Sequence, residues 1–131
     1  MKKFIVALAV LAVVAAGWFL RSRPTQTVTS GITGTVLLGP TCPVVRNPPD
    51  PQCADKPYRT TLAVTTVDGA RVVTTFTSDS NGTFSVQVPP GEYAIRSAAA
   101  SNILPYCSDE HVVVRASAYT TTTVRCDTGI R

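Results

Sequence analysis

The stretch DGARVVTTFTSDSNGTFSVQVPPGEY, residues 68–93, decides the fold of this chain. Turn residues punctuate it at 68–69, 79–82 and 89–91, and β-branched or aromatic residues alternate between these turns. Alternation with a period of two residues, bounded by turn signals, is typical of antiparallel strands. The pattern therefore predicts successive strands joined by hairpin turns. Their inward stripe is expected to consist of Phe76, Phe84, Val86, Val88 and Tyr93.

The rest of the chain carries the same kind of pattern. Helix-forming residues are scarce after Arg23, whereas Thr, Val, Pro and Gly dominate. Seven short strands with closely spaced turns are typical of a β-sandwich. We therefore predict an all-β sandwich of seven antiparallel strands, at residues 32–38, 60–67, 72–77, 84–88, 93–99, 111–115 and 119–125.

The first 23 residues carry a membrane signal. Two lysines precede an uncharged run at residues 4–20, and two arginines close it. Seventeen residues is the short end of the about 17–25 that span a bilayer, and it exceeds the about 7–15 of a signal-peptide core. We expect one N-terminal hydrophobic helix that anchors the chain in the membrane. Cleavage of a signal peptide after Ala16 stays open as the alternative, because residues 14–16 are Val-Ala-Ala.

The remainder is long enough for one domain. We predict an anchor or signal peptide at residues 1–23, a polar spacer at 24–30 and a single β-sandwich domain at 31–131. About 100 residues can form one two-layer core but not two. Four of the twelve basic residues lie in the first segment, so the rest carries eight basic and eight acidic residues. A neutral domain lacks the basic surface that nucleic acids require, so none is expected as a partner.

Four cysteines, Cys42, Cys53, Cys107 and Cys126, follow the export signal and predict two disulfides in an oxidising compartment. A zinc site is not expected, because the chain has one histidine and no CxxC spacing. The last two predicted strands are expected to form a hairpin, whose continued register places Cys107 opposite Cys126. Cys42 then pairs with Cys53 across a proline-rich loop. The domain is thus expected outside the cytoplasm, either as part of a single-pass cell-membrane protein or secreted after signal cleavage.

The segment SDSNGTFSVQVPPGEYAI, residues 78–95, resembles the motif D-x-x-G-x-F-x-V-x-L-P-P-G-x-Y-x-L of carboxypeptidase regulatory-like domains. Residues 34–36, Gly-Thr-Val, are similar to the opening strand of that family. The resemblance covers roughly residues 31–125 and implies a prealbumin-like, transthyretin-like, seven-stranded sandwich. It implies no particular activity, because such domains are appended to many exported proteins. The matching residues are Asp79, Gly82, Phe84, Val86, Val88, Pro89, Pro90, Gly91, Tyr93 and Ile95.

No group of residues forms a catalytic pattern. His111 is the only histidine, and Ser108, Asp109 and Glu110 come directly before it in the sequence. Catalysis by Ser, His and Asp needs three side chains brought together from separate elements, whereas neighbours in one strand face opposite ways. Asp50, Asp55 and Asp127 lack the spacing of a calcium-binding loop. We expect no catalytic residue, metal or cofactor.

Two segments contain more than folding requires. Residues 53–59, CADKPYR, combine an aromatic ring with both charges, and residues 126–131, CDTGIR, remain apolar and charged. Loops on a rigid scaffold are where binding residues usually lie. We predict a non-catalytic structural or protein-interaction module, membrane-tethered, with a protein or glycan partner; the alternative is a carbohydrate- or small-ligand-binding module of the same fold. The candidate binding residues are Asp55, Lys56, Tyr58, Arg59, Tyr106, Asp127 and Arg131.

Overall fold

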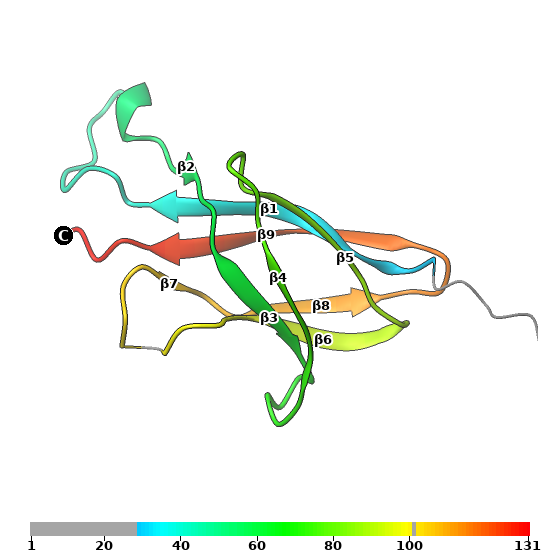
Figure 1. Cartoon of the computed structure of the whole chain (residues 1–131). Coiled ribbons are helices and arrows are strands. Elements are labelled where there is room, and N and C mark those ends of the chain that lie inside the picture. Colours follow the sequence, from blue (N-terminus) through cyan, green and yellow to red (C-terminus); the bar gives the residue numbers. More distant parts are fainter. Residues whose placement is uncertain (1–28, 101) are drawn as a thin grey trace, which may run out of the picture.

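The computed structural model describes residues 29–100 and 102–131 as a β-rich fold of two sheets (Figure 1). The predicted anchor at 1–23 and residues 24–28 of the predicted spacer lie outside this range. Within the described range there is no helix with the length and hydrophobicity of a membrane span. The elements are β1 (Gly31–Gly39), the 3-10 helix η1 (Pro51–Cys53), β2 (Lys56–Pro57), β3 (Thr61–Thr65), β4 (Val72–Thr77), β5 (Thr83–Gln87), β6 (Gly91–Ser97), β7 (Tyr106–Cys107), β8 (Glu110–Val114) and β9 (Tyr119–Asp127).

The described part of the chain has nine strands where seven were predicted. All seven predicted strands are present to within a few residues at their ends, and the two additional strands are β2 and β7. Each of these has only two residues, which is too short for an alternating pattern to be visible in the sequence. They form because their backbones extend existing ladders, β2 on the end of β1 and β7 on the end of β9.

The expectation of a purely antiparallel fold is wrong for the centre of the first sheet. This sheet, sheet A, has the order β2-β1-β9-β7, with β5 also paired to β1. β1 and β9 run parallel over their whole length, from Gly31 opposite Tyr119 to Gly39 opposite Asp127. Parallel pairing joins strands that are distant in the sequence, and the residues of one strand do not indicate which other strand it will pair with. As a result, β1 and β9 both end at the same edge of the molecule.

Most of the predicted hairpins are instead connections between the two sheets. The second sheet, sheet B, has the order β4-β3-β6-β8, so the links from β4 to β5, from β5 to β6 and from β8 to β9 each change sheet. Of the predicted hairpins, the one between β3 and β4 is formed as an antiparallel pair. β8 and β9 remain close together, and a hydrogen bond of 2.6 Å runs from the Thr120 hydroxyl to the Val113 carbonyl. The same turn residues serve both kinds of connection, so the turns alone do not distinguish them.

The turn at residues 79–82 shows how one of these sheet-to-sheet links is held. The Asp79 carboxylate accepts hydrogen bonds of 2.9 Å from the backbone N–H groups of Asn81 and Thr83, and one of 2.5 Å from the Thr83 hydroxyl. These bonds lower the pKa of Asp79, and the bond from the Thr83 hydroxyl contributes most. Gly82 has φ +72°, a conformation that disfavours residues with a Cβ atom. A Cβ atom here would also meet the carbonyl oxygen of Val36.

The core lies between the two sheets, because its fully buried side chains come from both of them. Of the predicted inward stripe, Phe84, Val88 and Tyr93 are buried, whereas Phe76 and Val86 are half-buried against the core edge. The last two lie on strands next to an open edge of their sheets, where solvent reaches one side. The other large buried side chains are Ile32, Val36, Leu62, Val64, Ile95, Val112, Val114 and Val124.

Candidate interaction surface

Three segments that are far apart in the sequence meet at one end of the molecule. The parallel strands β1 and β9 both finish there, so residues 40–55 and 128–131 leave from the same edge. β7 is antiparallel to β9 and pairs Tyr106 with Asp127, so residues 102–105 enter at this edge too. We call residues 40–56, 102–106 and 127–131 the loop end. It lies opposite the start of β1, as Figure 1 shows on its left side.

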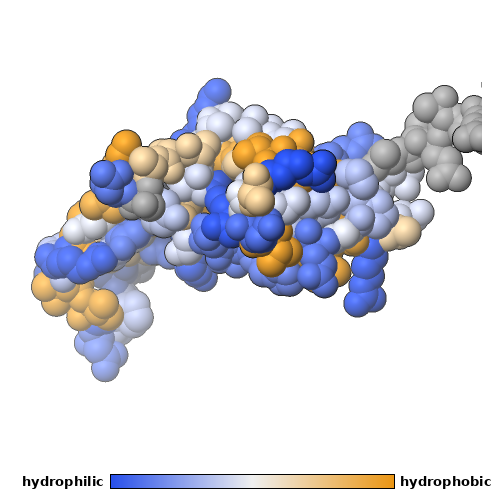
Figure 2. Space-filling model, turned by 90° about the horizontal axis from the view of Figure 1, so that it is seen from below, coloured by the Kyte–Doolittle hydropathy of each residue, from blue (hydrophilic) through white to orange (hydrophobic). Residues whose placement is uncertain are grey.

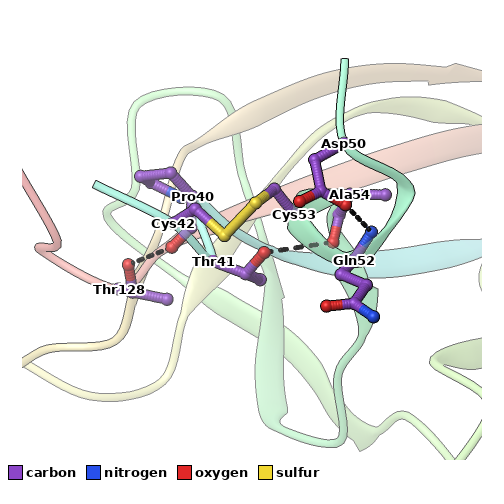
Figure 3. The surroundings of a disulfide bond; sticks show 8 residues. All are labelled: Pro40, Thr41, Cys42, Asp50, Gln52, Cys53, Ala54 and Thr128. Atoms are coloured by element: carbon purple, nitrogen blue, oxygen red, sulfur yellow. Dashed lines mark hydrogen bonds between the residues drawn. A yellow bond between two sulfur atoms is a disulfide. The ribbon is translucent and has the colours of Figure 1, made fainter. Parts of the chain in front are cut away.

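A disulfide closes the longest of these segments into a stapled loop. Cys42 and Cys53 are bonded, as predicted, with a Cα–Cα distance of 5.3 Å (Figure 3). The Thr41 hydroxyl donates a hydrogen bond of 3.3 Å to the Ala54 carbonyl beside this bond. Asp50 accepts the backbone N–H of Gln52 at 2.9 Å and thereby caps η1. The loop is therefore an ordered structure although it contains many prolines.

The stapled loop is also attached to the end of β9. Arg125 Nη1 lies 3.0 Å from Asp55 Oδ2, which makes an ion pair across 70 positions of the sequence. The backbone N–H of Thr128 donates to the Gly39 carbonyl at 3.1 Å, and its hydroxyl donates to the Pro40 carbonyl at 2.7 Å. These three bonds link the loop to β9 and to the C-terminal segment.

The C-terminal segment is folded back on itself by Asp127. Its carboxylate binds the Arg131 guanidinium through contacts of 3.2 and 2.8 Å, and it accepts the backbone N–H of Gly129 at 2.8 Å. These bonds lower the pKa of Asp127 from 3.8 to about 2, and the bond from Arg131 contributes most, followed by that from Gly129. We call this arrangement the Asp127 clamp.

The Asp127 clamp is expected to open in acid. Because the pKa of Asp127 in the folded chain, about 2, lies below the unfolded value of 3.8, the clamp stabilises the fold fully above about pH 4–5. This contribution disappears as the pH falls through the folded pKa. NMR titration of the Gly129 amide should give a midpoint near pH 2, and Asp127→Asn should remove the transition. A midpoint at pH 3.8 or above would contradict the clamp.

The second disulfide holds the remaining segment in place. Cys107 and Cys126 are bonded, as predicted, and lie directly opposite each other with a Cα–Cα distance of 3.8 Å. The reason differs from the one expected, since Cys107 belongs to β7 and not to an extension of a β8–β9 ladder. Both cysteines are buried in the core. This bond fixes where the chain emerges from residues 102–105 onto the loop end.

The structure brings together five of the seven predicted binding residues and separates the other two. The loop end contains Asp55, Lys56, Tyr106, Asp127 and Arg131. Tyr58 instead packs against the edge of the core, and Arg59 lies near enough to Asp79 for its charge to contribute to the lowered pKa of that group. The predicted set is thus divided between the loop end and the side of the molecule at the 79–82 turn.

Exposed aliphatic side chains at the loop end were missed by the sequence prediction. Nine large apolar side chains are exposed in the described residues, and five of them lie here. Leu104 lies directly against Gly129, so the C-terminal segment joins the stapled loop to the loop before β7. Figure 2 shows apolar residues gathered at this end of the molecule and also at other places on the same face. The five are Val44, Val45, Ile103, Leu104 and Ile130.

The stapled loop encloses a hollow of about 390 Å³. Its lining is mainly apolar and comes from both sides of the disulfide. The volume lies within the about 300–1,000 Å³ of ligand sites in proteins. The adjacent Val44 and Val45 between prolines are the part of the sequence that corresponds to it, but the sequence does not show whether a valine in a loop is buried or exposed. Lining residues include Pro40, Val44, Val45, Arg46, Pro49 and Asp50.

The residues considered for catalysis or metal binding form other contacts. His111 Nε2 lies 3.7 Å from Glu92 Oε2 on the neighbouring strand, and Asp109 binds Arg96 at 2.6 Å. Asp50 and Asp55 are engaged by Gln52 and Arg125, as described above. Within residues 29–100 and 102–131 there is no group of three or more His, Cys, Asp or Glu that could hold a metal ion.

Comparisons of the chain with protein-family models, with curated proteins and with solved structures give no match. The functional argument therefore rests on the chain's own residues. The two sheets are compatible with a β-sandwich, and the loop end is the part of the described chain in which ordered loops, charges and exposed apolar side chains coincide.

Proposed function

We propose that the chain is a non-catalytic, membrane-tethered module outside the cytoplasm, which presents the loop end to a partner protein. One observation carries the proposal: five exposed aliphatic side chains sit on segments braced by two disulfides and several polar bonds. A monomer gains nothing from ordering apolar side chains in water, whereas an interaction surface does.

The direction of the chain supports the tether. The hydrophobic run at residues 4–20 has the length of a short membrane span. The described chain starts at the end of the molecule opposite the loop end, since β1 runs from Gly31 toward Gly39. A domain held at its N-terminal side therefore directs the loop end away from the bilayer.

The disulfides support a location outside the cytoplasm. All four cysteines of the sequence are paired, and no free thiol remains. Structural disulfides persist in secreted and periplasmic compartments and are rare in the cytosol.

Several local structures support the prealbumin-like assignment. Asp79 and Gly82 of the motif form the turn before β5, and Phe84 is buried behind it. The Tyr93 hydroxyl donates a hydrogen bond of 2.6 Å to the Pro89 carbonyl, which accounts for the spacing of proline and tyrosine in the motif. These five motif residues thus have structural roles, as expected for a motif that marks a fold and not an activity.

A carbohydrate- or small-ligand-binding module of the same fold is the second candidate. The volume of the hollow favours it. Sugar binding usually employs exposed aromatic rings, however, and Tyr58 and Tyr106 are both half-buried. Among the described aromatic residues only Tyr119 is largely exposed, and it lies at the opposite end of β9.

The tether and its direction can be tested together. Cell fractionation should place the full chain in the membrane fraction, and N-terminal sequencing should begin at Met1 or Lys2. Protease added from outside the cytoplasmic membrane should reach the domain. A mature chain that begins at Gly17 would replace the anchor by a cleaved signal, and a domain accessible only from the cytoplasm would reject the proposal. A melting-temperature rise of several degrees with one glycan would favour the second candidate.

A further inference from the structure

We propose that the hollow of the stapled loop binds an apolar side chain of the partner protein, next to which the partner carries a carboxylate. This inference deepens the proposed function, on which it rests, by naming the site and the chemistry of the partner. It follows from the shape of the hollow, from the charges that line it and from the apolar residues around it.

The hollow is formed in advance of binding. The Cys42–Cys53 bond is part of its lining, and prolines on both sides restrict the backbone. Backbone N–H groups of Cys53 and Ala54 are already bonded to the Asp50 and Pro51 carbonyls, at 2.9 and 3.3 Å. A site ordered before binding loses little conformational entropy when it is filled.

The charges of the lining favour an acidic partner. Three charged side chains line the hollow, namely Arg46, Asp50 and Asp55. Asp50 is engaged as the cap of η1, and Asp55 is neutralised by Arg125. Within the described residues Arg46 has no hydrogen bond or ion pair. Because a guanidinium matches a carboxylate with two parallel hydrogen bonds, Arg46 is the lining group that is available to a ligand.

The surroundings favour a protein over a lipid surface. A protruding side chain fills a concave hollow, whereas a bilayer covers a convex tip. Val44 and Val45 of the lining are 65% and 96% exposed, and Leu104 and Ile130 are exposed on the other two segments of the loop end. Apolar side chains with charged groups beside them match the arrangement of a protein–protein interface, which has an apolar core and a polar rim. The N-terminal attachment at the opposite end also keeps this surface away from the membrane that would hold the anchor.

Random peptides displayed on phage provide the probe. The full chain in phosphatidylcholine nanodiscs is used for selection, and the affinity of the enriched synthetic peptide is then measured by fluorescence anisotropy. We expect a consensus in which a large apolar residue adjoins Asp or Glu. Val45→Asp should abolish binding, and Arg46→Gln should weaken it about tenfold, as expected for loss of a charge-assisted hydrogen bond. Arg115→Gln, an exposed arginine between β8 and β9, is the matched control and should bind normally.

Each other outcome overturns the inference. If the peptides bound Val45→Asp and Arg46→Gln with the same affinity as the unaltered chain, the chain would still be an interaction module, but its binding site would lie elsewhere. Absence of any enriched peptide would reject the hollow as a peptide site, while the tether would still be judged by fractionation. Binding of phosphatidylglycerol vesicles that Val45→Asp abolishes would identify a lipid surface as the occupant. Because both altered side chains are exposed, intact disulfides and an unchanged melting temperature confirm that each variant folds.

Discussion

Replacement of Phe84 by alanine is expected to lower the free energy of unfolding by about 3–5 kcal/mol, as for other buried aromatic residues. The Phe84 side chain is 7% exposed, and its ring stacks on Phe76 with centroids 4.6 Å apart. Phe84 is also the cross-strand partner of Gly34 and lies over it, and glycine has no side chain to fill the space. Guanidinium unfolding of the full chain, followed by circular dichroism, measures the loss.

Phe76→Ala is the matched control for this prediction. It removes the other ring of the same stacked pair, but Phe76 is only half-buried at the core edge. We therefore expect a smaller loss than for Phe84→Ala. If Phe84→Ala kept the melting temperature of the unaltered chain, β5 would have to present its other face to the core.

Replacement of both Cys107 and Cys126 by alanine is expected to cost about 2–5 kcal/mol. The bond constrains the unfolded chain over 19 residues, and its sulfur atoms also fill the core, since the two residues are 1% and 2% exposed. It is the main attachment of β7 to β9, so residues 102–106 should lose their place at the loop end. Denaturant unfolding measures the cost, and amide hydrogen exchange reports the local loosening.

The double variant of Cys42 and Cys53 is the control for the buried bond. Its loop is shorter, 11 residues against 19, which makes the entropic contribution smaller by about 0.5 kcal/mol. Both residues are half-exposed, so alanine there leaves no core cavity. We expect the loss in the buried pair to exceed that in the loop pair by more than the entropic difference. Equal losses would show that packing around Cys107 contributes nothing.

The strands and their buried faces could be predicted because they depend on local patterns. The period of two residues around Phe84 and Val88 indicates a strand with one inward face, whatever strand lies beside it. The disulfide pairing was predicted correctly, although for Cys107 the local path of the chain was different. Phe76 and Val86 were predicted to belong to the core, but they are half-buried at its edge, because the pattern carries no sign of an open sheet edge.

The candidate site was predicted only in part for a related reason. Charges and aromatic residues drew attention to Asp55, Asp127 and Arg131, which the structure does place together. The adjacent valines at 44 and 45 were missed, because a valine in a loop has the same sequence signature whether it is buried or exposed. Tyr58 was included as an exposed ring, whereas it packs against the core.

The sequence by itself determined the seven longer strands and which of their faces are apolar, since both depend on side chains that can be read in order. Tertiary structure decided that β1 lies parallel to β9 and that the turn at 79–82 joins two sheets. Strands pair through backbone N–H and C=O groups, which are nearly the same in every residue and therefore do not indicate which strand will pair with which. The loop end follows from that pairing, because its three segments meet only where β1 and β9 end together.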